Sequence, residues 1–549
     1  MESVISQWVS LLDDPSLRKQ AIQALSEGVK RLSDPEKRKT KKKELAEALI
    51  KAYEVNANRE EILLVLKELK ESSALPTFRQ AAQDLQPGKT DRLVAIAAEA
   101  LGEMRDPQSV SVLIPLTKVE TLPFIRMKAV RALGMIPDPS ATEPLIAVLK
   151  TPADKQERFL YTLAIVGLGN LKDERAVLPL LDALYLRQGD RDFSRWVTVA
   201  LTQLGDKSYQ SLLNALTNQV ESLKKMEKDR LLPPGRRGYL AAKALAELPN
   251  KTLFKAQVSL LSALEEETGP SSPREGAAYA LGMLGEAKSA EPLAKYLEEG
   301  YATRRIAIAR ALAMLGSPSA LPALFKMMRE GSYAADSSKI YHHPRWEAAR
   351  AISLLGNADA LTEYNDIISK EKDPASKKFF EEYRGNLEVT KECQGKTDCW
   401  KKKLSDPSWM IQEKAAYSLA QFKAKDAPSE LVKAYQKTPS YEARIAMLFA
   451  IRQIGAAAKD DLDALLAFSK TEESDPEKRK PFAESFEEPA PPPKEDEAPK
   501  PPIKKYKPKQ AEFLSGDPIT LSDLAYEIRL TIAKLDPNSF FELPKDWDW

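Results

Sequence analysis

Two cysteines are the residues of this chain with the clearest capacity for covalent chemistry, and both lie in the segment KECQGKTDCW. Cys393 and Cys399 are separated by five residues that include Gly395, so the chain can turn back and bring the two Cα atoms within the ~4.4–6.8 Å of a disulfide. Zinc would need a shorter spacing and two more ligands nearby, and a thiol–disulfide catalyst would favour C-x-x-C at a helix N-terminus. The remaining alternatives are a local disulfide, which we expect, and two free thiols.

Other residue patterns that could support catalysis are missing from the sequence. The two histidines, His342 and His343, are adjacent in a polar stretch, where imidazoles more often titrate in solvent than bind a metal. The sequence contains no G-x-x-x-x-G-K-[ST] phosphate loop, no G-x-S-x-G elbow and no strand pattern for a dinucleotide fold. We therefore predict no catalytic residue, no metal and no cofactor, and a protein that is not an enzyme.

The composition argues against recognition by a global charge. The 549 residues include 82 Lys and Arg against 80 Asp and Glu, so a net charge of +2 creates no field that attracts nucleic acid or an anionic membrane. The basic run KRKTKKK at 37–43 could meet phosphates or acidic protein, but Glu44 and Glu47 follow at once and no aromatic residue is present for stacking. We interpret it as a solvated face. No run approaches the ~20 apolar residues of a membrane span, so we expect other proteins as partners, no nucleic acid and no membrane span.

The elements that must position these residues are short amphipathic helices, and the segment 126–150 shows their pattern. A first helix presents one apolar stripe, formed by Ala129, Val130, Leu133 and Ile136. Pro137-Asp138-Pro139 cannot continue it, and Asp138 or Ser140 can accept from the open N–H groups of a second helix. The second helix presents Leu145, Ile146 and Leu149. One such pair cannot bury its apolar faces alone.

The same pair recurs along the chain. Triplets of the Ala-Leu-Gly type end the first helix at 100–102, 132–134, 167–169 and 280–282, and Gly102, Gly134 and Gly169 are 32 and 35 positions apart. A two-helix unit with this period predicts an α-solenoid, in which neighbouring pairs bury each other's apolar faces. The chain lacks the T-P-L-H motif of ankyrin units and the Trp/Gly/Tyr placement of tetratricopeptide units.

The repeat pattern ALGxxxDPxAxxPLIxxL at 132–149 resembles the HEAT subtype first named for bilin-attaching lyases, and the resemblance covers most of residues 94–465. It implies an all-α HEAT-repeat solenoid, a superhelix of antiparallel helix pairs in which small residues let the first helices stack closely. These repeats serve mainly in protein contacts, which implies a non-enzymatic scaffold or adaptor. An enzyme-associated protein, lyase-like or substrate-presenting, is the alternative. The iron-dependent HEAT hydroxylases are excluded, because two adjacent histidines cannot build their paired His-Glu motifs.

The segment around the cysteines carries a second resemblance. Cys-x5-Cys-aromatic followed by DPSWMIQEKAAYSLA is similar to a segment of exported HEAT-repeat proteins of Gram-negative bacteria. This similarity implies a periplasmic or cell-envelope location. The opening MESVISQWVSLL is amphipathic and has no charged region followed by an apolar one, so export would mean that the signal has been removed. A cytoplasmic location is the alternative.

Lengthened connections after the second helix of a pair predict an interaction surface. They lie at 185–193, 224–238 and 331–343, and connections of one kind project from one edge of a solenoid. Insertion without function is the alternative. The candidate interaction residues in these connections are Lys224, Lys225, Arg236, Arg237, Tyr333, Tyr341, His342 and His343.

Five arginines share one position near the start of the first helix of a pair: Arg126, Arg274, Arg305, Arg345 and Arg444. Their stems should follow the apolar stripe while the guanidinium groups reach polar groups of the adjoining unit, which predicts a structural ladder. The alternative is a basic row that binds an acidic partner.

After the repeats the character of the chain changes. Residues 473–512 are dense in Pro, Glu and Lys and should form a disordered, extended linker. A C-terminal helix follows, with a capping box of Thr520 and Asp523, a staple from Ile519 to Leu524, and an apolar face of Leu521, Leu524, Ala525, Ile528, Ile532 and Leu535. It should pack on the solenoid or on a second protomer, which makes a homo-oligomer possible.

The tail after this helix adds further candidate interaction residues, Phe540, Phe541, Trp547 and Trp549, which are too apolar to stay in water without a contact. The sequence thus predicts four parts: capping and degenerate helical repeats at 1–93, the solenoid at 94–472, the linker at 473–512, and the helix with its aromatic tail at 513–549.

Overall fold

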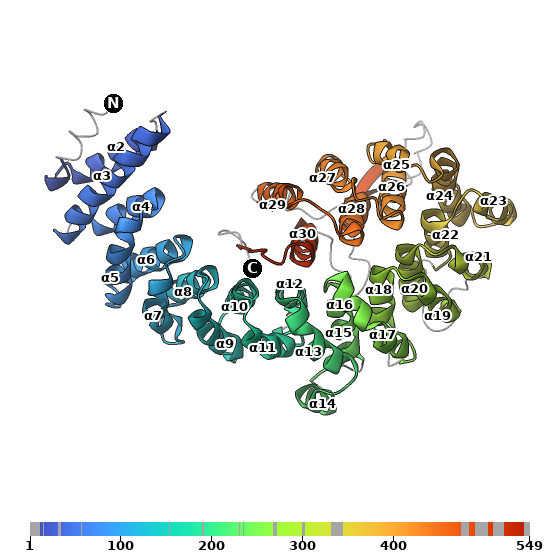
Figure 1. The fold of residues 1–549 in the computed structure, drawn as a ribbon, viewed down its shortest axis with the longest axis horizontal. Coiled ribbons are helices and arrows are strands. Elements are labelled where there is room, and N and C mark those ends of the chain that lie inside the picture. Colours follow the sequence, from blue (N-terminus) through green and yellow to red (C-terminus); the bar gives the residue numbers. More distant parts are fainter. Residues whose placement is uncertain are drawn as a thin grey trace, which may run out of the picture.

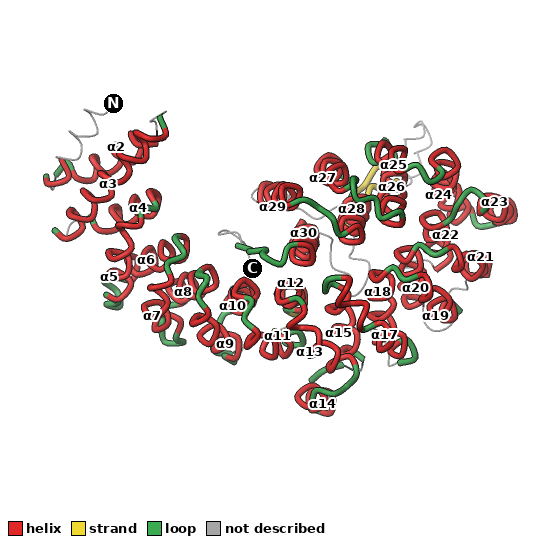
Figure 2. Tube along the Cα trace, in the orientation of Figure 1, coloured by secondary structure: helices red, strands yellow, loops and turns green. Residues whose placement is uncertain are grey.

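A computed structural model describes residues 11–14, 16–30, 34–55, 58–152, 154–188, 191–229, 231–233, 235–266, 272–298, 302–330, 344–473, 483–488, 503–508 and 521–542. The fold is an α-solenoid of helix pairs, as the sequence predicts. Figure 1 shows the pairs following one another along a curve from α2 to α29, with α30 lying inside the curve. Figure 2 shows that helices make up nearly all of the described chain.

The solenoid has an N-terminal section and a series of pairs. The N-terminal helices are α2 (Arg18–Lys30), α3 (Pro35–Glu54), α4 (Arg59–Leu69) and α5 (Leu75–Gln83). The first helices of the following pairs stack in order: α6 (Asp91–Glu103), α8 (Pro123–Met135), α10 (Arg158–Leu171), α12 (Ser194–Leu204), α15 (Arg236–Ala246), α18 (Pro273–Leu284), α20 (Ala302–Leu315), α22 (Pro344–Leu355), α26 (Trp409–Gln421) and α28 (Tyr441–Ile454).

The second helices lie on the other side of each pair: α7 (Val110–Leu113), α9 (Thr142–Lys150), α11 (Val177–Ala183), α13 (Asp206–Leu216), α17 (Gln257–Ala263), α19 (Ala290–Ala294), α21 (Leu321–Glu330), α23 (Ala360–Lys370), α27 (Pro428–Lys437) and α29 (Lys459–Glu473). Additional helices are α14 (Glu221–Lys228), α16 (Asn250–Lys255), α24 (Pro374–Cys393), α25 (Thr397–Lys403) and α30 (Leu521–Leu535). The basic run 37–43 lies on α3, whose first turn is capped by Asp34.

The pair α8–α9 confirms the helix pattern read from the sequence. The predicted stripe residues are all buried: Ala129, Val130, Leu133, Ile136, Leu145, Ile146 and Leu149. Small residues set the spacing between first helices. A Cβ on Gly134 would lie 2.7 Å from the Cα of Gly167, so α8 and α10 approach to a distance that only glycine permits at this point.

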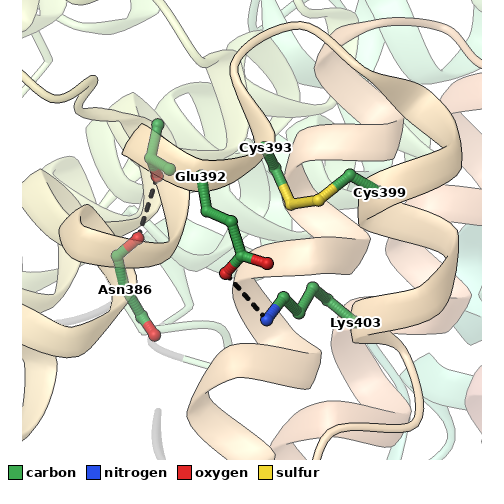
Figure 3. The surroundings of a disulfide bond; sticks show 6 residues. Asn386, Glu392, Cys393, Cys399 and Lys403 are labelled. Carbon is green, nitrogen blue, oxygen red and sulfur yellow. Dashed lines mark hydrogen bonds and ion pairs between the residues drawn. A yellow bond between two sulfur atoms is a disulfide. The ribbon is translucent and has the colours of Figure 1, made fainter.

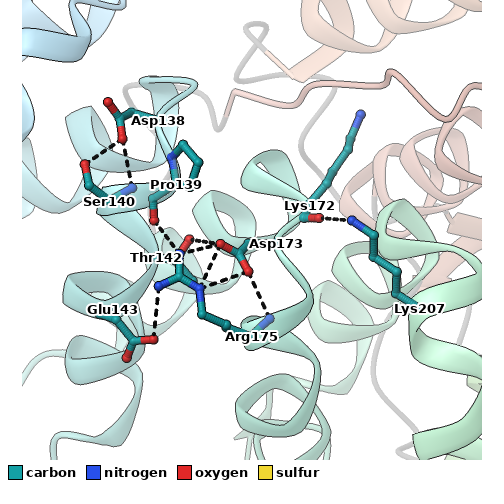
Figure 4. Close-up of polar contacts among 9 residues, drawn as sticks. All are labelled: Asp138, Pro139, Ser140, Thr142, Glu143, Lys172, Asp173, Arg175 and Lys207. Carbon is teal, nitrogen blue, oxygen red and sulfur yellow. Dashed lines mark hydrogen bonds and ion pairs between the residues drawn. The ribbon is translucent and has the colours of Figure 1, made fainter.

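The turns between the two helices of a pair also join neighbouring pairs (Figure 4). Asp173 accepts from the backbone N of Arg175 at 3.0 Å and from Thr142 Oγ1 of the preceding pair at 3.1 Å. The Arg175 guanidinium donates to the same carboxylate and, at 2.7 Å, to Pro139 O of the preceding pair. The hydrogen bonds from Arg175 hold the pKa of Asp173 at about 2. This turn therefore fixes the start of its own second helix and the stacking of its pair on the preceding one.

The arginine ladder is confirmed as a structural feature. In each of the five, Nε donates to a carbonyl at or near the end of the preceding second helix: Arg126 to Thr117 at 2.8 Å, Arg274 to Leu264 at 2.6 Å, Arg305 to Leu297 at 2.6 Å, Arg345 to Met328 at 2.7 Å and Arg444 to Thr438 at 2.9 Å. Carbonyls at a helix end lack intrahelical partners, and a cation there also complements the helix dipole. The alternative of an open basic row for an acidic partner is wrong, because these groups are buried or half-buried in internal contacts.

The expectation of a disordered linker at 473–512 is wrong for 483–488 and 503–508, which form two paired strands. Helix α29 reaches Glu473, and β3 (Ala483–Glu488) pairs in antiparallel register with β4 (Ile503–Pro508). The register places Glu484 opposite Lys507 and Glu487 opposite Lys504. Opposite charges at directly facing positions favour such a strand pairing. Composition alone does not predict the pairing, because the two strands are separated in sequence.

Candidate protein-binding surface

Helix α30 packs inside the curve of the solenoid, against α12 on one side and α28 and α29 on the other (Figure 1). Its apolar face is covered there, with Leu524, Ala525, Ile528 and Ile532 all at most 5% exposed. The predicted docking of this helix onto the solenoid occurs within one chain, so a second protomer is not needed to cover that face. Thr520, Ile519 and the side chain of Asp523, which form the predicted cap, lie outside the described residues.

Buried ion pairs fix the position of α30. Arg529 makes two hydrogen bonds with the Glu473 carboxylate, at 3.0 and 3.1 Å, with both side chains at most 3% exposed. Arg452 on α28 lies 3.2 Å from Glu247 and 3.0 Å from Glu527. Such pairs need matched partners at one geometry, because an unpaired buried charge is costly. The helix is therefore held by its own particular side chains.

Lys534, near the end of α30, adds a contact with a helix end of the solenoid. Its Nζ donates to Ala246 O at 2.8 Å, and the side chain is buried. Burial lowers the pKa of Lys534 to about 8, with the Glu247 carboxylate opposing that shift. Burial also raises the pKa of Glu527, although the charge of Arg452 opposes this shift.

The residues after α30 lie in what we call the tail groove, formed by Arg105, Asn170, Lys172 and Gln203 on the inner surface. Asn170 Nδ2 donates to Phe541 O at 2.8 Å, and Asn170 Oδ1 accepts from Phe541 N at 2.9 Å. Two more groove residues donate to carbonyls of the tail: Gln203 to Ser539 at 3.1 Å and Lys172 to Pro537. Four hydrogen bonds of the groove thus go to main-chain atoms of the tail.

Two side chains of the tail make specific contacts. Phe541 is 2% exposed, whereas Phe540 is half-buried under Arg105, whose Cζ lies 4.0 Å from the ring centroid. The same guanidinium lies 3.7 Å from the Glu542 carboxylate. Glu542 also lines a pocket, together with Lys70, Glu99, Glu103, Lys128, Arg131, Ala132 and Met135. Trp547 and Trp549 lie outside the described residues.

One repeat position in the sequence is a signal for part of this groove. Asn170 directly follows the triplet at 167–169, and Gln203 and Glu247 directly follow the corresponding residues at 200–202 and 244–246. This repeat position therefore provides polar side chains in several pairs, whereas Met135 and Met283 occupy it in two others.

The predicted rim of lengthened connections is partly present. Tyr185 OH donates to Arg237 O at 3.0 Å, so the first two connections lie side by side, and Figure 1 shows α14 projecting from the outer side of the curve. Lys224 and Lys225 lie on α14, where Lys224 pairs with Glu221. Arg236 is half-buried at the start of α15.

Arg237 is not an interaction residue, which corrects the prediction. It is 5% exposed, donates to Ala215 O and to Leu216 O at 3.0 Å, and pairs with Glu227 at 3.2 Å. The reason is that it binds the end of α13 much as the ladder arginines bind their helix ends. Four other candidates in the rim, Tyr333, Tyr341, His342 and His343, lie outside the described residues.

The cysteines form a disulfide in the structure (Figure 3). Cys393 ends α24 and Cys399 lies in α25, with the two Cα atoms 5.3 Å apart. An ion pair between Glu392 and Lys403, at 3.0 Å, joins the same two helices. The cross-link is local, as the short loop predicts.

Among the described residues, no group of three or more His, Cys, Asp or Glu is placed to hold a metal ion. Nor does any helix in the described ranges have the length and apolarity needed to cross a membrane.

Comparison with known families identifies HEAT repeats at residues 90–161 and 258–341. These two stretches therefore carry HEAT repeats, and the described helix pairs form an α-solenoid. A comparison with curated proteins finds no match.

Comparison with solved structures returns matches of low sequence identity and low TM-score. The complex of CpcE and CpcF of phycocyanin lyase from Nostoc sp. PCC7120 is 18% identical over 52% of this chain and 97% of that chain, with a TM-score of 0.28. Yeast importin-β (Kap95p) is 11% identical over 86% of this chain and 64% of that chain, with a TM-score of 0.38. Human deoxyhypusine hydroxylase is 17% identical over 58% of this chain and 96% of that chain, with a TM-score of 0.21.

Proposed function

We propose that this protein is a non-enzymatic scaffold or adaptor that binds other proteins along the inner surface of its solenoid, within a cell-envelope assembly. The observation that carries the proposal is the double hydrogen bond between Asn170 and the backbone of Phe541. It supports binding of a polypeptide segment on the inner surface, because main-chain atoms are the groups that are bound. The rim at α14 offers a second exposed surface on the same rigid frame.

The proposed location rests on the cysteines. The sequence contains two, and the structure joins Cys393 to Cys399. Disulfides persist in oxidising compartments such as the periplasm and are rare in the cytosol. A cell-envelope location is consistent with that chemistry.

Affinity capture tests the function. The full chain would be tagged in its own cell and recovered from the envelope fraction after mild cross-linking, and the co-purifying proteins would be identified by mass spectrometry. We expect a small set of proteins in stoichiometric amounts, reduced by a charge reversal of Lys224 and Lys225 on α14 or by Asn170→Ala in the groove. A matched control is Gln210→Ala, at an exposed position of α13. Recovery of the folded full chain without any stoichiometric protein would contradict the proposal.

A further inference from the structure

The segment after the linker is held in two different ways. Helix α30 depends on matched side chains, namely the buried pairs Arg529–Glu473 and Arg452–Glu527. The tail at 537–542 depends mainly on hydrogen bonds to its main chain, at Pro537, Ser539 and Phe541. Main-chain groups are the same in almost every residue, so the groove can bind them in another polypeptide of suitable shape.

The remaining contacts define which sequence fits. One aromatic side chain, that of Phe541, enters a buried site, and the next, that of Phe540, lies half-buried under the Arg105 guanidinium. The same guanidinium faces the Glu542 carboxylate. A cation that contacts both an aromatic face and a carboxylate favours an aromatic residue followed within two positions by an acidic one. The groove therefore fits an extended segment with two adjacent aromatic residues and an acidic residue after them.

The tail can leave the groove without disturbing α30. Pro537, Asn538 and Glu542 are exposed, and a turn separates the helix from the tail, with Asp536 accepting from the N atoms of Asn538 at 2.9 Å and Ser539 at 3.0 Å. None of the buried ion pairs that hold α30 involves a residue of the tail. Release of the tail would uncover Asn170, Lys172 and Gln203 while the solenoid and α30 stay in place.

We propose that the tail groove is a binding site for an extended aromatic–aromatic–acidic segment of a partner protein, and that residues 537–542 of this chain occupy it as an internal ligand which the partner displaces. This proposal deepens the scaffold function, on which it rests, by naming the chemistry of the partner. The pocket at Glu542 adjoins the site and has a mixed lining, in which Lys70 pairs with Glu103 and Lys128 with Glu99.

The test uses the full chain and a fluorescent synthetic peptide with the sequence DPNSFFEL. In a variant with Phe540→Ser and Phe541→Pro the native tail loses both aromatic side chains and the Phe541 N–H that Asn170 Oδ1 accepts, and we expect this variant to bind the peptide saturably in fluorescence polarisation. Adding Asn170→Ala should weaken binding about ten-fold or more, because two main-chain hydrogen bonds are lost. The wild-type chain should bind more weakly than the variant with the released tail, because its own tail competes. Gln210→Ala should leave the affinity unchanged.

A charge exchange at an exposed position gives a second test that leaves the core intact. Arg105→Glu should weaken binding of DPNSFFEL and strengthen binding of DPNSFFKL. Two results of the peptide assay would overturn the proposal: no binding by the variant with the released tail, or equal affinity with and without Asn170→Ala. Concentration-dependent dimers in which tails exchange between copies would also overturn it, because the groove would then bind a second copy of this chain. If the peptide assays fail but affinity capture still recovers partners that bind at α14, this proposal alone is rejected. If the peptide binds but no partner is captured, the scaffold function is rejected.

Discussion

Asn170 on α10 binds both main-chain polar groups of Phe541, a residue 371 positions later in the chain, through hydrogen bonds of 2.8 and 2.9 Å. An asparagine amide can donate and accept at once, so a single side chain replaces the two contacts that a neighbouring β-strand would provide. At this point the inner surface of the solenoid binds the main chain of its own C-terminal tail.

Replacing Asn170 should separate the behaviour of the tail from that of α30. We expect Asn170→Ala to expose the amide of Phe541 to hydrogen exchange, since its acceptor is removed, while the amides of Ile528 and Ile532 keep their protection. Hydrogen exchange with mass spectrometry on the full chain would measure both segments, with Gln210→Ala as the control. Loss of protection in both segments together would show that tail and helix are released as one unit.

Removing one partner of the buried pair Arg529–Glu473 should lower the free energy of unfolding much more than replacing both partners with apolar residues. Arg529→Met leaves the Glu473 carboxylate buried without its cation, and we expect it to lower the free energy of unfolding by about 3 kcal/mol or more. Adding Glu473→Leu removes the stranded charge and should recover most of that loss. Urea unfolding of the full chain followed by circular dichroism would measure both. A double variant as unstable as the single one would mean that packing around Arg529, and not charge, accounts for the loss.

The repeat could be predicted from the sequence because its defining positions recur locally. The stripe of Ala129, Val130 and Leu133 and the position of Arg126 are visible within one helix pair, and both predictions are confirmed. The docking of α30 is different in kind. Its apolar face was predictable, but Glu473 lies 56 positions before Arg529, and no local pattern links them. The same limit applies to Arg237. Its basic, Pro/Gly-rich neighbourhood predicted an exposed side chain, but no local pattern shows that its guanidinium contacts the end of α13.

The docking of α30 should strengthen as the pH rises above about 8. Burial lowers the pKa of Lys534 to about 8, while the unfolded chain keeps an ordinary lysine pKa of about 10.4. Between these values the unfolded chain holds a proton that the folded chain has released, so the free energy of unfolding rises with pH. Below pH 8 both states are protonated and the dependence on this group disappears.

The comparison of wild type with Lys534→Met isolates this effect. Lys414 is also buried, and burial lowers its pKa to about 7. This group also makes the free energy of unfolding rise with pH, so part of the rise should persist in the variant. Between pH 8.0 and 9.5 the urea midpoint should rise more in wild type than in Lys534→Met. An equal rise in the two proteins would contradict the assignment.

The close approach of α8 and α10 predicts opposite effects for two glycine substitutions. Gly167→Ala places a Cβ 2.7 Å from the Cα of Gly134 and should destabilise the fold by about 1–3 kcal/mol, because two helix backbones must move apart. Gly385→Ala lies in α24 with no atom within 4 Å of the added Cβ and should stabilise it by about 0.5–1 kcal/mol, because alanine favours the helix. Thermal unfolding of both variants would show whether the signs differ, and a neutral Gly167→Ala would mean that this contact relaxes easily.

The last prediction concerns Cys393 and Cys399 in the cell. Because the closed loop is short, chain entropy gives the disulfide at most roughly 2–3 kcal/mol, enough to fix the α24–α25 connection and too little to hold the solenoid together. Reduction should therefore increase hydrogen exchange around 393–404 and leave the pairs from α6 to α20 unchanged. Non-reducing peptide mapping of protein from its own cell should recover the two cysteines as one cross-linked species. Free, alkylatable thiols at both positions would remove the chemical support for the cell-envelope location, because a cytosolic protein keeps such thiols reduced.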